Sequence, residues 1–253
     1  MNKIYYDMIF KRKSFHIFKE TGTISNDELN TIESIYKKLQ PLYPEIKTMM
    51  RIVPADETTC KRGQQYCILL YSEKKEGYLQ NIGYLGEQLD LHLTNMNIGA
   101  LWFGIGKVKE PQYQTLDFVI MFAIAKMPED KFRNNMFKSK RKDLTEIWYG
   151  DAHTDIGNVA RFSPSACNSQ PWITEASESE LKVYRYRKPG KRGIMPKDKV
   201  VYYNRIDIGI YLWFLETCLH HHQIPFNRTL HPDTSDEEKV LTAVYILTKR
   251  DNF

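Results

Sequence analysis

The sequence predicts an α+β fold in which helices and a few strands share one hydrophobic core. Of its 253 residues, 42% are hydrophobic and 26% are charged, which is the composition of an ordinary globular protein. Amphipathic helical segments are mixed with strand-like runs, and the spacing of several runs suits antiparallel pairing. The length is sufficient for one large domain or for two small ones with a shared core.

Two helices are predicted near the N-terminus. Residues 2–12 form the first. The second begins after Ser25, whose hydroxyl can accept a backbone hydrogen bond while Glu28, three residues later, returns one, as in a capping box. An amphipathic run continues to about Leu42, where two prolines end the helix.

Hydrophobic periodicity predicts the remaining elements. Across 81–96, apolar or small residues recur at spacings of three and four, which indicates an amphipathic helix. An apolar helix is predicted over 206–221, and one interrupted by two glycines over about 144–159. The predicted strands are short apolar or alternating runs, at 65–71, 116–126, 180–186 and 243–248.

Two stretches of the chain suggest an internal duplication. Arg51–Pro54 is followed by a strand and then by Asn81–Gly83, which opens a long helix. Arg161–Pro164 is likewise followed by a strand and then by Asp207–Gly209, which opens another.

Charge and residue content exclude several classes of protein. Lys and Arg (36) exceed Asp and Glu (31) by five, a mild surplus that suits an anionic ligand or solubility and is too weak to indicate nucleic-acid binding. The four cysteines are scattered, and the three histidines at 220–222 point in different directions on a helix, so no metal site is expected. No apolar run approaches the roughly 20 residues of a membrane span, and no signal peptide is evident. We therefore expect a soluble, cytoplasmic protein without a membrane partner.

A basic group ends the first predicted helix. Arg12 offers a planar fork of donors, the neighbouring lysines offer point charges, and Ser14 a hydroxyl, with His16 close by. This group suits a terminal phosphate. The alternative is a solvated basic helix end that complements the helix dipole.

Three later segments are further candidates for a binding site. Ser163–Trp172 concentrates small polar side chains between prolines, which can hydrogen-bond a heteroaromatic ring and a polyol; the alternative is a structural loop. Gly99–Gly104 is predicted as a turn whose backbone can approach a flat ligand, or as a simple helix end. Lys138–Lys142 is either a second phosphate clamp or an exposed loop.

Together these segments resemble the nitroreductase family of flavin mononucleotide (FMN) proteins. The most specific likeness is Pro-Ser-x-x-Asn-x-Gln-Pro-Trp at 164–172. Supporting likenesses are Arg-x-Ser at 12–14, the Gly-x-x-Trp-type segment 99–104 and the late basic segment 138–141. The resemblance spans about residues 5–250.

The order of these segments departs from the family. The Pro-Ser loop arrives about 150 residues after the Arg-x-Ser segment, whereas ordinary members have it within a few tens of residues and form homodimers with flavins at the interface. The resemblance therefore implies a nitroreductase-like fold with two related halves, 1–142 and 143–253, that form a pseudo-dimer within one chain. We expect a monomer of a single-chain branch, with one composite flavin site and the second site lost.

The resemblance also implies which residues bind FMN. His16 stands where the family commonly has Arg or Lys, and a protonated His can still bind a phosphate. The phosphate would contact Arg12, Lys13, Ser14, His16, Lys140 and Arg141. The ring and ribityl chain would contact Leu101, Trp102, Gly104, Pro164, Ser165, Ala166 and Asn168.

By the same resemblance, the protein is an FMN-dependent oxidoreductase. NADH or NADPH would reduce the flavin, leave, and be replaced by a nitroaromatic, a quinone or another small acceptor, with ping-pong kinetics. No side chain is predicted to be catalytic, because the chemistry belongs to the flavin. The alternatives are a degenerate flavin-binding or ligand-sensing member without turnover, a flavin-consuming enzyme, and a basic nucleic-acid binder.

Overall fold

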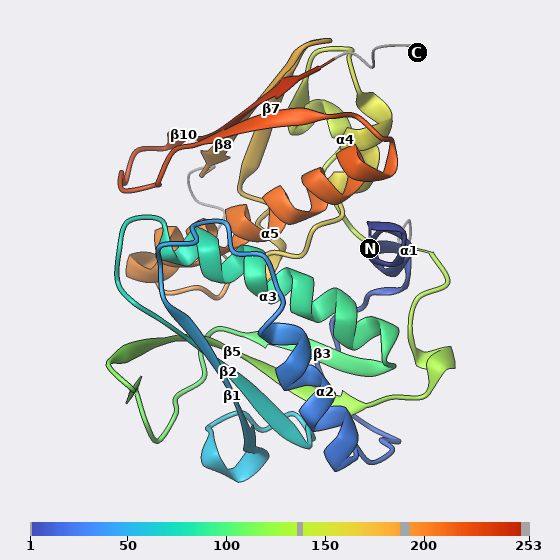
Figure 1. Ribbon diagram of the computed structural model, residues 1–253, viewed down its shortest axis with the longest axis vertical. Coiled ribbons are helices and arrows are strands. Elements are labelled where there is room, and N and C mark those ends of the chain that lie inside the picture. The colour runs from blue at the N-terminus through green and yellow to red at the C-terminus, as the bar shows by residue number, and fades with distance from the viewer. Residues whose placement is uncertain (1, 136–138, 188–192, 249–253) are drawn as a thin grey trace.

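Two sheets enclose a central layer of helices (Figure 1). The computed structural model describes residues 2–135, 139–187 and 193–248. The helices are α1 (Asn2–Lys11), α2 (Asn26–Tyr36), α3 (Tyr78–Asn95), α4 (Thr154–Ala160) and α5 (Val200–His221). The strands are β1 (Thr48–Pro54), β2 (Tyr66–Ser72), β3 (Ile98–Phe103), β4 (Gln112–Tyr113), β5 (Leu116–Lys126), β6 (Trp148–Tyr149), β7 (Trp172–Ala176), β8 (Glu180–Tyr186), β9 (Phe226–Leu230) and β10 (Lys239–Leu247).

The two sheets repeat one topology. Among the described residues, the first sheet has the order β1-β2-β5-β3 with β4 on β5, and the second has the order β6-β7-β8-β10-β9. Leaving out β4 and β6, each unit runs strand, strand, long helix, strand, strand, with α3 in one and α5 in the other. All the pairings are antiparallel except β6 with β7. The predicted α+β fold of two related halves is confirmed; the boundary between residues 142 and 143 stays a prediction.

The long helices of the two units meet at a reciprocal glycine contact. A Cβ added to Gly83 of α3 would lie 2.0 Å from the carbonyl oxygen of Ile206 on α5. A Cβ added to Gly209 of α5 would lie 1.9 Å from the carbonyl oxygen of Gln80 on α3. Each glycine thus packs on the residue three positions before the other, as expected for a two-fold relation between the units. α1 packs against both helices (Figure 1).

The same two-fold relation pairs two helix side chains that hold loops. Asn81, two residues before Gly83, accepts the backbone N–H groups of Leu42 and Tyr43 at 2.8 and 3.0 Å. Asp207, two residues before Gly209, accepts the N–H of Ala166 at 2.9 Å. The loop before β1 is therefore the counterpart of the loop before β7.

This correspondence corrects the sequence alignment of the halves. The duplication motif placed Pro54 opposite Pro164. In the structure Pro54 ends β1, whereas Pro164 precedes β7, so its counterpart is Pro41 in the loop before β1. The pairing of Asn81–Gly83 with Asp207–Gly209 is correct, because helix contacts determine it.

Most predicted elements are present, and two assignments are wrong. The capping box of Ser25 and Glu28 is formed as predicted. Residues 144–159 do not form one helix: a 3₁₀ turn and β6 precede α4, and Gly150 has a φ of +112°. Most of the Gly99–Gly104 segment is strand β3 instead of a turn. The strands β1, β7 and β9 were missed: β1 and β7 lack clear polar alternation, and β9 has only five residues.

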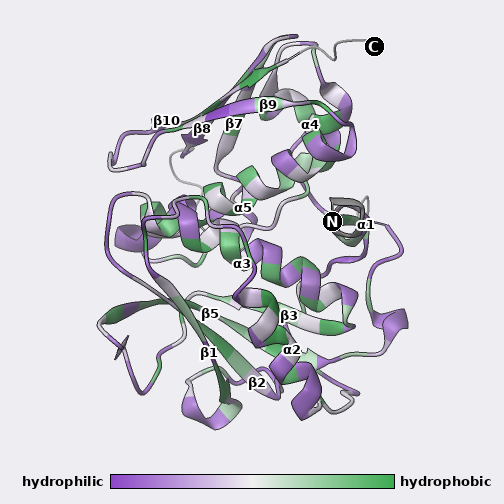
Figure 2. Cartoon of the chain, viewed as in Figure 1, coloured by the Kyte–Doolittle hydropathy of each residue, from purple (hydrophilic) through white to green (hydrophobic). Residues whose placement is uncertain are grey.

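Each sheet buries one face against the helical layer. Trp172 and Tyr211 stack with ring centroids 4.8 Å apart between β7 and α5. Ile82 and Phe122 are fully buried between α3 and β5. Burial of this apolar surface is the main driving force for folding, and Figure 2 shows hydrophobic residues along the central strands. Within the described residues, no helix has both the length and the apolar character needed to cross a bilayer.

We predict that Gly209→Ala destabilises the protein through the helix contact. Alanine is favoured over glycine in helices by about 1 kcal/mol, but its Cβ would clash with the backbone of α3, where overpacking costs about 1–3 kcal/mol or more. Urea unfolding should show a net loss of stability. Gly22→Ala, whose Cβ would meet only the flexible side chain of Lys126, is the control. Equal stability of the two variants would contradict the contact.

Candidate functional site

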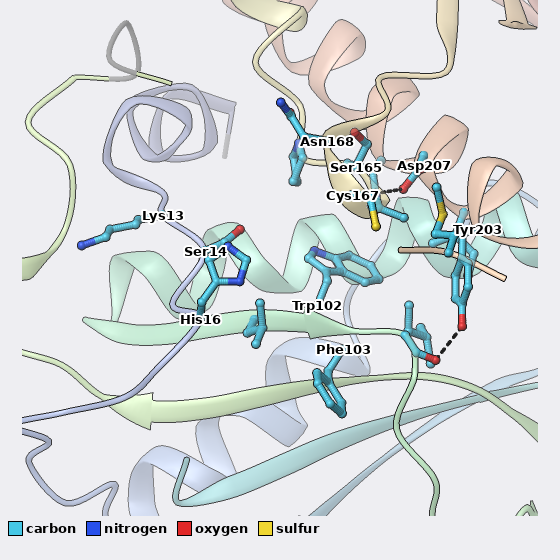
Figure 3. A pocket seen from close by; sticks show the side chains of 18 of the residues that line it. Lys13, Ser14, His16, Trp102, Phe103, Ser165, Cys167, Asn168, Tyr203 and Asp207 are labelled. Atoms are coloured by element: carbon cyan, nitrogen blue, oxygen red, sulfur yellow. Dashed lines mark hydrogen bonds between the residues drawn. The ribbon is translucent and has the colours of Figure 1, made fainter. Parts of the chain in front are cut away.

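A cavity of about 590 Å³ lies where the two units meet. Its walls come from the segment after α1, from β3, from the loop at 163–170 and from α5 (Figure 3). Side chains that follow α1 or belong to β3 lie on one side, opposite those of the loop and of α5 (Figure 3). The volume is in the range of small-molecule sites. The cavity is lined by all thirteen predicted residues: Arg12, Lys13, Ser14, His16, Leu101, Trp102, Gly104, Lys140, Arg141, Pro164, Ser165, Ala166 and Asn168.

Three arginines gather at one end of the cavity. Arg133 donates to the backbone oxygen of Arg12 at 3.3 Å, and Arg141 donates to Asn168 Oδ1 at 2.9 Å. Burial, together with the positive charges of Arg12 and Arg133, lowers the pKa of Arg141 to about 9. The Nε of Arg141 is buried without a hydrogen-bond partner among the described residues. This end of the cavity therefore favours an anion.

Arg12 is held from behind by acidic side chains of α3. Its Nη1 lies 2.9 Å from Asp90 Oδ2, and its Nε lies 3.9 Å from Glu87 Oε1. Its Nη2 donates to Ser14 Oγ at 3.3 Å. Burial and the neighbouring Asp90 raise the pKa of Glu87 well above its usual value, so a neutral Glu87 beside the Arg12–Asp90 ion pair is favoured. The guanidinium is fixed in place rather than free, which sequence reasoning did not foresee.

The other predicted phosphate contacts differ in orientation. Lys13 borders the cavity, but its ammonium donates to the carbonyl of Lys131 at 2.9 Å and points away from the other labelled side chains (Figure 3). His16 is exposed at the cavity wall. Lys140 lines the cavity, and its carbonyl accepts from Arg141 and Asn168. Lys138 lies outside the described residues.

The loop at 163–170 has an unusual backbone. Cys167, Asn168 and Gln170 have φ values of +50°, +53° and +48°, in the left-handed region that non-glycine residues seldom adopt. Hydrogen bonds hold this shape: Gln170 N donates to Ser165 Oγ at 2.9 Å, and Lys142 N donates to Gln170 Oε1 at 2.8 Å. Such left-handed residues beside a cavity are typical of loops whose shape is fixed by surrounding contacts.

The edge strand β3 supplies the opposite wall. Trp102 lies across Gly86, where an added Cβ would be 2.3 Å from the ring, and its Nε1 donates to Glu87 Oε2 at 3.3 Å. At Gly104, where β3 has just ended, an added Cβ would be 2.6 Å from the Tyr203 ring. Tyr203 donates to the Gly104 carbonyl at 2.8 Å (Figure 3). Because Gly86 and Gly104 lack a Cβ, the rings of Trp102 and Tyr203 can pack against them and complete this wall of the cavity.

Several lining residues were missed by sequence reasoning. Arg133 was not among the predicted residues, and Asp207 appeared only in the duplication motif. The apolar members of α5 gave no local signal, because their periodicity is that of any buried helix. The residues missed are Arg62, Phe103, Ile105, Ile120, Arg133, Ser139, Cys167, Ile194, Met195, Tyr203, Ile206, Asp207 and Ile210.

The comparisons with known proteins identify the family. Residues 4–218 match the model of the family described as "Putative TM nitroreductase", so the chain belongs to this branch of the nitroreductases. No curated protein matches the sequence. Within the described residues, no group of three or more potential ligands could hold a metal.

One solved structure shares the fold over nearly the whole chain, and two shorter ones are similar to about half of it. A putative nitroreductase from Thermotoga maritima is 20% identical with a TM-score of 0.63, over 96% of this chain and 93% of that one. A nitroreductase family protein from Clostridium novyi is 18% identical with a TM-score of 0.42, over 50% of this chain and 88% of that one. A putative nitroreductase from Desulfovibrio desulfuricans, solved in complex with FMN, is 16% identical with a TM-score of 0.40, over 56% and 93%.

We predict a pH-dependent stability effect of Asp207→Asn. Burial raises the pKa of Asp207 to about 7, so the folded state holds this proton more tightly than the unfolded chain does. The stabilisation is fully present below the unfolded pKa of about 3.9 and is lost as pH rises through about 7. The variant has no such proton to lose. Its unfolding free energy relative to wild type should rise by about 2 kcal/mol between pH 5 and 8. A constant difference in urea titrations would contradict this.

Proposed function

We propose that the protein is an FMN-dependent oxidoreductase that moves electrons from NADH or NADPH to a small acceptor. The observation that carries the proposal is the polarity of this cavity, which has three arginines at one end and apolar walls from β3 and α5 at the other. A ligand that joins a phosphate to a flat ring matches both ends. Membership of the nitroreductase family supports the same ligand.

The residues present fit this cofactor. A phosphate would offer an acceptor to the unpartnered Nε of Arg141 and would relieve the repulsion among the clustered guanidinium groups. Ser14 and the Asn168 side chain would hydrogen-bond the polar chain, and Trp102 and Tyr203 would flank the ring. When bound, FMN supplies the hydride chemistry, and the protein orients the reactants and excludes water.

The counterpart position in the other unit argues for one flavin per chain. By the two-fold relation, Tyr84 stands in place of Ile210 and Glu216 in place of Asp90. The hydroxyls of Tyr84 and Tyr245 each donate to Glu216 at 2.7 Å, and Arg228 donates to it at 2.6 Å. The positive charge of Arg228 is therefore balanced by a carboxylate. Tyr84, Glu216 and Arg228 line a second hollow, and among the described residues no arginine cluster like that of the first cavity lines it.

The proposed electron transfer needs only one reactant site. NADH or NADPH would bind over the ring, leave, and be replaced by the acceptor, for which quinones and nitroaromatics are the candidates. Aromatic and aliphatic walls suit flat, uncharged acceptors. The alternative is a flavin-binding or ligand-sensing protein without turnover; the arginine cluster would serve that role equally well, so kinetics must decide between them.

We predict that FMN binds at one molecule per chain and depends on Arg141. Arg141→Gln removes a positive charge from the anion end, and the dissociation constant for FMN should rise at least about tenfold. Quenching of flavin fluorescence on titration measures both quantities. Lys37→Gln removes the same charge at an exposed position and is the matched control. No binding by the wild type, or equal affinity of both variants, would refute the assignment of the site.

We predict parallel double-reciprocal plots for NADH or NADPH oxidation with a quinone as acceptor, because the two substrates occupy the same place in turn. Steady-state absorbance at varied concentrations of both substrates provides the test.

Tight flavin binding with negligible turnover would instead favour the non-catalytic alternative. Release of flavin fragments under oxygen would indicate consumption of the cofactor. Salt-sensitive binding to nucleic acid without bound flavin would favour the nucleic-acid binder.

A further inference from the structure

We propose that Asp207 is a positioning residue for the cofactor, because its carboxylate holds the 163–170 loop in the conformation that lines the cavity. This inference rests on the proposed function. It concerns a side chain of α5 that sequence reasoning did not place in the site. Figure 3 shows Asp207 bonded to this loop beside Ser165 and Cys167.

The loop needs external support to keep its shape. Three of its four residues from 167 to 170 have left-handed backbone angles without being glycine. Each such residue is disfavoured on its own and persists only where surrounding contacts fix it. Segment 140–142 supplies contacts at the end of the loop, through Arg141 to Asn168 and through Lys142 to Gln170. The beginning of the loop is fixed from α5.

Asp207 makes that second attachment. Its Oδ1 accepts the N–H of Ala166 at 2.9 Å, one residue before the left-handed stretch begins at Cys167. Its Oδ2 lies 3.4 Å from the amide nitrogen of Asn204, and Ser169 also hydrogen-bonds the carboxyl. The side chain is 3% exposed and borders the cavity. A buried carboxyl satisfied only by neutral donors is costly, which indicates that this bond serves a purpose.

The first unit shows the role of the equivalent side chain at a loop that does not line the cavity. Asn81, the counterpart of Asp207, accepts two backbone N–H groups of the loop before β1. Asn81 does not border the cavity, and its loop contains no left-handed residue within 41–46. Asn81 and Asp207 therefore make equivalent hydrogen bonds to a loop. Only the loop held by Asp207 places residues, Ser165 and Asn168, at the cavity. This pair provides an internal control.

The test uses purified full-length chain and FMN as the probe. Asp207→Ala has no acceptor atom, and Asp207→Ser has one on a shorter side chain that does not reach the loop. Both variants should weaken FMN binding about tenfold or more and speed amide exchange at 166–170. Asp207→Asn keeps the acceptor oxygen and should stay within about threefold of wild type. Asn81→Ala should lower stability while leaving the dissociation constant for FMN within about threefold.

Several results would overturn the proposal. Wild-type affinity in both Asp207→Ala and Asp207→Ser would show that the bond does not position the loop. Equal losses in Asn81→Ala would show a global effect on stability. A loss in Asp207→Asn as large as in Asp207→Ala would assign the effect to charge. If the wild type binds no FMN, the proposed function fails separately. Exchange in the free protein then decides: faster exchange at 166–170 in Asp207→Ala alone supports the attachment, and unchanged exchange refutes it.

Discussion

The close contact of α3 and α5 through Gly83 and Gly209 is the constraint on which the rest of the structure depends. Each glycine lets the backbone of one helix approach a carbonyl of the other more closely than any side chain would permit. Because the contact is reciprocal, it fixes both the separation and the relative rotation of the units. Both sheets, and the loops held by Asn81 and Asp207, are positioned by these two helices (Figure 1).

The cavity is a consequence of this arrangement. The segment after α1 brings Arg12 beside the acidic side chains of α3, while the 163–170 loop approaches from the second unit. Arg12 is neutralised from behind by Asp90, whereas Arg133 and Arg141 add further positive charge. Burial lowers the pKa of Arg141 most, and the charges of Arg12 and Arg133 lower it further. An anion bound at this end would balance the remaining positive charge of the arginines.

Sequence reasoning located the cavity better than it located the strands. The Pro-Ser loop and the Arg-x-Ser segment carry unusual side chains, so their resemblance to a family identified residues that the fold brings together from 150 positions apart. The capping box and strand β5 were predictable because each has a local cause. β1 and β7 were not, since strands without clear polar alternation depend on their neighbours in the sheet. Asp207 carried no local signal of its role, because the hydrogen bond that defines it spans 41 residues.

The two units place different side chains at equivalent positions beside their two hollows. Ile210 leaves room beside the loop, whereas Tyr84, at the equivalent position, directs its hydroxyl to Glu216. Glu216 also accepts a hydrogen bond from Arg228, so a polar network whose buried partners are satisfied borders the second hollow. The first cavity instead combines the arginine cluster with the strained 163–170 loop of the second unit, features that cost stability unless a ligand uses them.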